Sequence, residues 1–296
     1  FFLTWRDVKV RYKQTALGAA WAILQPLFMM VIFTIFFGRL AGVGSSGIPY
    51  PLFALAGLVP WTFFANSITA SGKSLVGSAH LITKVYFPRL IVPAAAMLAG
   101  LVDFVLAFVL LCILMLYYRV TLTVQILFLP VLVLMTALFS LGVGTWMSAL
   151  NVKYRDVSFV VPFLVQFWMY ASPIAYSASI IPYQWRPLYA LNPMVSVVEG
   201  FRWALLGKSA PDLRAMLVSL AIVIVLLLSG LYYFRKTEET LTDTIAFCEG
   251  LRKLPVRVNE CAGFLVNRVL MPYLNEAAFC AQEGTPLKEI DKTKVE

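Results

Sequence analysis

Residues 90–117 read LIVPAAAMLAGLVDFVLAFVLLCILMLY, and Asp103 is the only charged residue among them. The hydrocarbon core of a bilayer is about 30 Å thick, and a helix needs roughly 20 apolar residues to cross it. Backbone groups in lipid have no water to bind, so a crossing segment must satisfy them within a helix. The stretch therefore predicts a transmembrane helix and an integral membrane protein.

Five further apolar runs lie before and after this stretch. Charged residues, proline or glycine separate each run from the next. The six predicted transmembrane helices are residues 20–38, 52–71, 90–117, 124–149, 157–178 and 214–234. The predicted fold class is an all-α integral membrane protein with six transmembrane helices, an N-terminal interfacial helix and a short soluble helical tail.

The composition divides the chain into two parts. Of all 296 residues, 60% are hydrophobic and 13% are charged, whereas a soluble domain is about half apolar and about a quarter charged. Residues 1–236 hold 17 Lys and Arg against 5 Asp and Glu, and residues 237–296 hold 7 against 10. The average excludes a disordered chain, a secreted disulfide scaffold and an ordinary cytosolic enzyme. We expect a membrane domain over 1–236 and a soluble tail over 237–296.

The loops between the predicted helices differ in charge on the two sides of the membrane. The side that carries both termini has eleven Lys and Arg residues, and the other side has six. The eleven are Arg6, Lys9, Arg11, Lys13, Lys73, Lys84, Arg89, Lys153, Arg155, Arg235 and Lys236. The positive-inside rule places the more basic side in the cytoplasm. Both termini are therefore predicted to be cytoplasmic.

Residues 1–13 have the pattern of an amphipathic helix. One face holds Phe1, Trp5, Val8 and Tyr12, and the opposite face holds Arg6, Lys9 and Lys13. The cations of such a helix lie over anionic head groups while its apolar face enters the bilayer. We predict a cytoplasmic interfacial helix; the alternative is a disordered basic leader. Its candidate functional residues are Trp5, Arg6, Lys9, Arg11 and Lys13.

The connection between the last two predicted spans, residues 179–213, is too long and too apolar for a plain loop. Four prolines interrupt it, and the pieces at 189–191 and 195–206 are helix-like but too short to span. We predict two re-entrant half-helices on the outer side; the alternative is a loop on the membrane surface. The residues that mark this region are Asn192, Pro193, Glu199 and Arg202. Glu199 and Arg202 can pair at a spacing of three residues, or one of them contacts a substrate.

Some intramembrane residues are candidates for lining a pore. An ionisable residue within a span, such as Asp103, is a functional hypothesis by default. Aromatic rings crowded into one run could stack against sugars. The candidates are Trp21, Asp103, Phe167, Trp168, Tyr170 and Tyr176. The alternatives are a buried acid satisfied by neighbouring helices, and aromatic side chains that face lipid or pack in the interior.

The chain shows no motif for catalysis. The two Gly-Lys-Ser triplets at 72–74 and 207–209 lack the earlier glycine of a phosphate-binding loop, because Ser67 and Arg202 stand at that position. His80 is the single histidine, and the four cysteines form no C-x-x-C pair. We expect no catalytic residue, no metal site, no cofactor and no nucleic-acid partner for this chain.

Residues 1–240 resemble the permeases of ABC-2 type transporters, in the branch that exports polysaccharides or polyol phosphates. Several short stretches carry the resemblance by their order and spacing. They are WRDVKVRYK at 5–13, LG at 17–18 with Trp21, LQP at 24–26, PW at 60–61 with FF at 63–64, KVYFPR at 84–89, YRDV at 154–157, NP at 192–193 and EGFR at 199–202. The membrane domain 1–236 is therefore identified as a permease domain.

The resemblance implies a homodimer of permeases in the bacterial cytoplasmic membrane, with a separate cytosolic ATPase that binds ATP and Mg²⁺. It implies an undecaprenyl-linked glycan, such as O-antigen, capsule or teichoic acid, as cargo. It also implies that the loop 72–89 carries a coupling helix that contacts the ATPase, and the loop is long enough for a short helix over 75–83. The candidate residues of this coupling loop are Gly72, Lys73, His80, Lys84, Tyr86 and Arg89. A drug or lipid cargo is the alternative, and neighbouring glycosyltransferase genes would favour the glycan.

The tail is similar to another family. Residues 255–260 and 263–277 resemble the start of the C-terminal domain of 3-hydroxyacyl-CoA dehydrogenases, and Asn267 matches that family's active-site Asn. Ala262 stands where the family has proline, and the NAD-binding motif is not in the sequence. We interpret the tail as a fused or vestigial fragment. A membrane-anchored dehydrogenase is the third hypothesis, and NAD-dependent oxidation of a hydroxyacyl-CoA would support it.

Overall fold

A computed structural model describes residues 2–13, 20–45, 47–78, 87–121, 123–154, 156–207 and 210–250. Only the backbone is described for Arg11, Tyr183 and residues 239–250. The chain divides into two compact units, Phe1–Glu238 and Glu239–Glu296. The predicted soluble tail lies outside the described residues beyond Gly250.

The described part is helical and contains no strand. The longer helices are α1 (Phe2–Lys13), α2 (Ala20–Phe33), α3 (Tyr50–Gly77), α5 (Ile91–Tyr117), α6 (Leu129–Lys153), α7 (Val157–Tyr170), α9 (Pro193–Leu206) and α10 (Leu213–Gly250). A π-helical segment, η1 (Thr34–Leu40), continues α2, and η2 (Val124–Phe128) leads into α6. Short turns form η3 (Ala178–Ile180), η4 (Tyr183–Trp185) and α8 (Arg186–Tyr189).

Five of the described helices are long and apolar enough to cross a membrane. They are Ala20–Leu40, Tyr50–Gly77, Ile91–Tyr117, Val124–Lys153 and Leu213–Glu238. They coincide with five of the six predicted runs, so the all-α membrane class is confirmed. The predicted number of six spans is not confirmed.

The predicted span at 157–178 is wrong in its length. Helix α7 has 14 residues and ends at Tyr170, so it is only about 21 Å long. Pro173 follows closely, and a proline disfavours helical backbone in the residue before it. The apolar run continues to 178, but its second part forms turns at 171–176 instead of helix.

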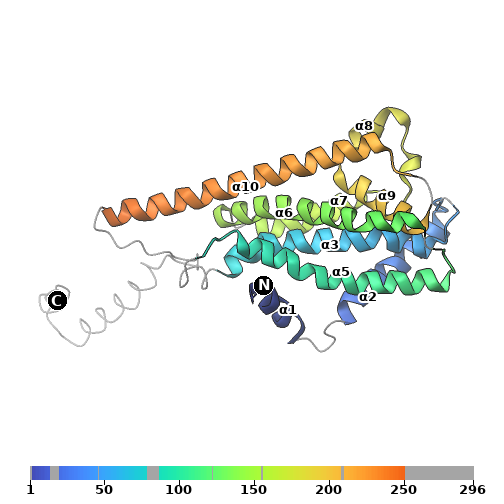
Figure 1. The fold of residues 1–296 in the computed structure, drawn as a ribbon, viewed down its shortest axis with the longest axis horizontal. Helices are drawn as coiled ribbons and strands as arrows, with labels where there is room; N and C mark the ends of the chain where they lie inside the picture. Colours follow the sequence, from blue (N-terminus) through green and yellow to red (C-terminus); the bar gives the residue numbers. More distant parts are fainter. Residues whose placement is uncertain are drawn as a thin grey trace, which may run out of the picture. The chain divides into compact units, whose positions relative to one another are not determined.

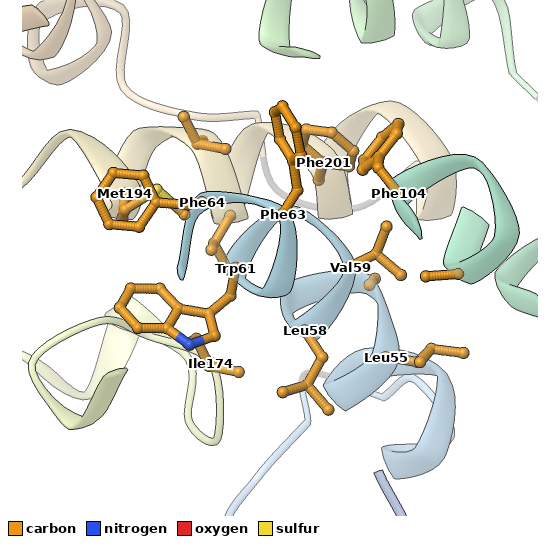
Figure 2. Packing of buried hydrophobic residues seen from close by; sticks show 14 of the residues in the cluster. Leu55, Leu58, Val59, Trp61, Phe63, Phe64, Phe104, Ile174, Met194 and Phe201 are labelled. Carbon is orange, nitrogen blue, oxygen red and sulfur yellow. The ribbon is translucent and has the colours of Figure 1, made fainter. Parts of the chain in front are cut away.

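Helix α3 is the centre of the core. It contacts α2, α5, α6, α7 and α9, and almost all of its side chains from Tyr50 to Phe64 are buried. Figure 2 shows Leu55, Trp61 and Phe63 radiating from this helix, with Phe201 of α9 and Phe104 of α5 beside it. An apolar helix of a membrane protein can face either protein or lipid, and α3 faces protein on almost all sides. In Figure 1, α3 accordingly lies between α5 and α6.

Small residues let the helices approach closely at two seams. A Cβ on Gly144 of α6 would lie 2.8 Å from Cβ of Ser71 on α3. A Cβ on Gly230 of α10 would lie 2.5 Å from the carbonyl oxygen of Gly142 on α6. Small residues at helix crossings are typical of membrane bundles, where close packing replaces the hydrophobic effect as the force that joins helices.

The connection 179–213 contains one buried helix instead of two half-helices. Asn192 caps α9 by accepting a hydrogen bond from the Met194 N–H at 3.1 Å, and Gly207 ends the helix with φ 68°. The predicted pattern at 195–206 thus matches α9. The pattern at 189–191 does not form a half-helix, because α8 is a single exposed turn that ends at Tyr189. Whether α9 is re-entrant remains a prediction.

Candidate functional site

Helix α1 forms over the residues predicted for the interfacial helix and packs against α5. Arg6 pairs with Asp7 at 2.8 Å, and the Lys9 ammonium lies 5.5 Å from the ring centre of Trp5. Trp5 is 51% exposed, and Lys13 is exposed as well. The side chain of Arg11 lies outside the described part. The position of α1 in the membrane interface is still a prediction.

Asp103 has a partner that its own helix does not indicate. The Tyr12 hydroxyl of α1 donates a hydrogen bond to Oδ1 of Asp103 on α5. The sequence carries no signal for this contact, because the two residues are 91 positions apart. The half-buried acid therefore joins two helices, which is the kind of role given above as the alternative to a pore-lining residue.

The structure separates the aromatic candidates. Trp168 packs inside, with its ring centre 5.3 Å from Phe64, and its indole N–H donates to Oδ1 of Asn192 at 3.0 Å. Phe167 and Tyr170 point outward and are 70% and 56% exposed. They continue an exposed aromatic stripe along α7. The members of the stripe are Phe159, Phe163, Phe167 and Tyr170.

The two other aromatic candidates lie apart from this stripe. Tyr176 bonds the Tyr189 hydroxyl at 3.0 Å and the Tyr170 carbonyl at 3.1 Å. Trp21 is exposed at the start of α2. The six pore candidates therefore do not form one group.

Arg202 of α9 is buried and fastens the turn after α7 to α3. Its guanidinium donates to the carbonyls of Pro173 at 2.6 Å and Ile174 at 2.7 Å, with longer bonds to Tyr176 and Phe53. It also lies 3.5 Å from the ring centre of Phe53. A guanidinium has five N–H donors in a fixed plane, and the turn offers carbonyls that no helix uses.

Glu199 does not pair with Arg202 in the predicted way. Among the described residues no ion pair joins them, because the guanidinium donates to backbone carbonyls instead. Burial raises the pKa of the Glu199 carboxyl, and the nearby Arg202 and Arg186 oppose that rise. Pro193 starts α9 and is buried beside Asn192. The four marked residues thus shape one buried helix end and the turn beside it.

The start of the predicted coupling loop is held by helix α6. The Asn151 amide, 5% exposed, donates to the Gly72 carbonyl at 2.9 Å. The Ser71 hydroxyl donates to the Pro93 carbonyl of α5 at 2.9 Å. Lys73 is exposed. The first residues of the expected coupling helix at 75–83 continue α3 as far as Gly77.

The end of the loop is held by helix α10. Arg89 lies 3.6 Å from the Glu238 carboxylate. His80, Lys84, Tyr86 and the rest of 79–86 lie outside the described residues. Sequence reasoning missed both Asn151 and Glu238, because each acts across the fold.

A second apolar cluster lies between the two loop ends. It joins the last turn of α3, the first turn of α5, the end of α6 and the middle of α10. Its buried members are Leu75, Val92, Ala149 and Phe234, with Phe87, Leu90, Val152 and Tyr233 packed against them. Four helices therefore meet where the loop begins and ends.

Comparison with known proteins gives two family matches. The sequence profile of the ABC-2 type transporter family matches residues 1–206. The profile of the 3-hydroxyacyl-CoA dehydrogenase C-terminal domain matches residues 263–295, outside the described part.

Similar individual proteins are transport permeases. An O-antigen export system permease protein RfbA of Myxococcus xanthus is 30% identical over 82% of this chain and 94% of its own length. An RfbA protein of Klebsiella pneumoniae is 28% identical over 68% of this chain and 77% of its own. The polysialic acid transport protein KpsM of Escherichia coli is 25% identical over 80% of this chain and 92% of its own.

Proposed function

Because this chain belongs to the ABC-2 type transporter family, we propose that it is the membrane-spanning permease subunit of a polysaccharide exporter. The observation that carries the proposal is the likeness to an O-antigen export permease along 94% of that protein's length. Five helices long and apolar enough to cross a membrane agree with a multi-pass permease. We place the protein in the cytoplasmic membrane, with both termini inside.

The cargo we propose is a lipid-linked glycan, with undecaprenyl pyrophosphate as the carrier. A long polymer needs a continuous path and a cationic entry for the pyrophosphate, and it needs no reacting group on the permease. The exposed Lys9 and Lys13 of α1 supply positive charge on the predicted cytoplasmic side. The likeness to O-antigen and polysialic acid transport proteins favours a glycan over a drug or a simple lipid.

The path is proposed to form between two copies of the chain. One copy has an exposed aromatic stripe on α7, including Phe163 and Phe167, which a second copy could face. Rings of this kind can stack on sugar faces while remaining compatible with a lipid carrier. Lipid contact is the alternative for the same stripe.

Energy is proposed to come from a cytosolic ATPase on a separate chain, which binds ATP and Mg²⁺. Its docking site is the loop 72–89, where Lys73 is exposed. The tail 237–296 is proposed to be dispensable for transport, apart from its first residues, because its residues 263–295 match a dehydrogenase domain and not a transporter family.

The experiment that tests the function is reconstitution in lipid vesicles. The chain, its ATPase and a lipid-linked O-antigen are combined, and delivery of the glycan across the membrane is measured with and without ATP. Export that requires both proteins and ATP is expected. A vesicle loaded with a hydrophobic drug is the matched control for cargo. Drug movement without glycan movement would contradict the glycan assignment.

A further inference from the structure

Two contacts hold the residues at the two ends of the predicted coupling loop 72–89. At the first end, the buried Asn151 amide donates to the Gly72 carbonyl at 2.9 Å, within α3 and five residues before that helix ends at Gly77. At the other end, Arg89 lies 3.6 Å from Glu238. Asn151 belongs to α6 and Glu238 to α10, so the ends of one loop are fastened to two helices that follow it in the chain.

Helices α6 and α10 are themselves firmly joined. The Trp146 and Tyr233 rings stack with centres 4.6 Å apart and planes at 6°. The Trp146 indole N–H donates to the Ser229 hydroxyl at 3.2 Å. Trp146 lies five residues before Asn151 on α6, and Tyr233 lies five residues before Glu238 on α10. The two helices are thus joined about one and a half turns before the residues that contact Gly72 and Arg89.

The backbones of the two helices also touch. A Cβ on Gly142 would lie 2.9 Å from the backbone of Leu227, so only glycine permits the crossing. A closely packed crossing resists sliding, because interiors at native density transmit displacement instead of absorbing it. A displacement of the loop would therefore reach α6 and α10 together.

We propose that Asn151 and Glu238 are positioning residues that couple the loop 72–89 to the α6–α10 pair. The inference rests on the proposed function, in which the loop receives the force of the ATPase. Asn151 holds the first end through a neutral hydrogen bond, and Glu238 holds the second through a charged contact. Neither residue is required to touch the ATPase or the glycan.

The second apolar cluster explains why two polar contacts are enough to position the loop against α6 and α10. Leu75, Val92 and Phe234 are buried in one cluster that joins the last turn of α3, the first turn of α5 and the middle of α10. The apolar cluster supplies cohesion but little direction, since the hydrophobic effect is non-directional. The hydrogen bond and the ion pair supply the register between the loop and the helices.

The test is the number of glycans exported per ATP hydrolysed by the complete reconstituted complex. Arg89→Glu and Glu238→Arg should each lower this ratio about two- to fivefold, as expected for a partly exposed ion pair. The double variant should recover to within about twofold of the wild type. Glu239→Arg makes the same charge change about 100° around α10 and should leave the ratio unchanged.

Asn151 is tested by a matched pair on one helix. Asn151→Ala should lower the ratio to a similar degree. Ser148→Ala lies one turn earlier on α6, and the hydroxyl it removes is buried without a hydrogen-bond partner in the described part. That control should leave the ratio unchanged. The amount of complex with the ATPase should be equal for the Glu238 and Asn151 variants, because neither residue belongs to the proposed docking loop, and a merely structural role would not leave it equal.

Three outcomes would overturn the inference. One is a normal ratio in the single variants, and another is a double variant no better than the worse single. The third is loss of the ATPase from the complex, which would make these residues part of the docking surface or the fold. Absence of export by the wild-type complex would instead refute the proposed function, and the inference would fall with it.

Discussion

Gly57 of α3 lies directly against the guanidinium of Arg202, and a Cβ at Gly57 would come within 2.9 Å of Nη2. The close approach puts the Arg202 cation over the Phe53 ring and within reach of the carbonyls of the turn at 171–176. Tyr50 supports the same turn, because its hydroxyl donates to the Ala175 carbonyl at 2.5 Å. The turn after α7 is therefore held by α3 and α9 together.

Arg202→Lys should destabilise the protein although it keeps the charge. An ammonium is a point donor and cannot reach the Pro173, Ile174 and Phe53 carbonyls from one position. Each buried acceptor left without a partner costs about 1–3 kcal/mol. We expect the Tm of the purified protein in detergent to fall by about 5 °C or more. Arg39→Lys, an exposed exchange of the same kind, should not change it.

Gly57→Ala should also lower the Tm, because the new methyl group displaces the guanidinium of Arg202. Gly77 in the same helix is the control, since a Cβ there meets nothing within 4 Å. Gly77→Ala should leave the Tm unchanged or slightly raised. The double variant Gly57→Ala with Arg202→Lys should lose less than the sum of the two single losses. Full additivity would show that the two residues do not depend on each other.

Tyr12→Phe should loosen α1 from α5. The substitution removes the hydroxyl that donates to Asp103 and keeps the ring. Asp103→Asn keeps an acceptor oxygen, so it should preserve the contact better than Asp103→Leu. Limited proteolysis of α1 in detergent reports the difference, and cleavage should be faster for Tyr12→Phe and Asp103→Leu than for Asp103→Asn. Equal protection in all three variants would contradict a docking role for this bond.

The predicted orientation makes Ser45 accessible from outside and Ser78 accessible only from the cytoplasm. Single cysteines at these positions, in a chain whose four native cysteines are replaced, can be labelled in intact cells with a reagent that does not cross the membrane. Labelling of Ser45→Cys before lysis and of Ser78→Cys only after lysis is the expected result. Labelling of Ser78→Cys in intact cells would reverse the topology derived from the charge of the loops.

Local hydropathy predicted the fold well where the apolar run alone sets the length of the helix. The run at 90–117 differs from α5 by one residue at its start, because the apolar run has the length that a helix needs to cross a bilayer. The prediction of a span at 157–178 was wrong because it relied on hydropathy and gave no weight to Pro173, and because the Arg202 contacts that hold the turn come from α9. Hydropathy does not reveal a turn inside an apolar stretch; the residues that contact the turn do.

Site residues were harder to predict than helices, because their partners are distant in the chain. Phe167 and Trp168 are adjacent in sequence, yet one is exposed and the other packs on Phe64. Which face of α7 is buried depends on α3 and α6, and no periodicity within 14 residues of apolar sequence reveals it. The anchors Asn151 and Glu238 escaped prediction for the same reason.

Truncation within α10 should separate the tail from the transport function. The sequence predicts that the permease is complete at Lys236, but α10 continues to Gly250 and Glu238 contacts Arg89. A chain ended after Lys236 loses that contact, so we expect it to insert and bind the ATPase but to export less glycan per ATP. A chain ended after Gly250 keeps Glu238 and lacks the dehydrogenase-like residues 263–295. It should export like the full chain.

Glycan export and ATP hydrolysis are measured for both truncated chains in reconstituted vesicles. Glu238→Gln in the full chain isolates the contribution of the carboxylate. Equal ratios for the two truncated chains would show that Glu238 is dispensable, whereas a deficit in both would assign a transport role to residues after Gly250.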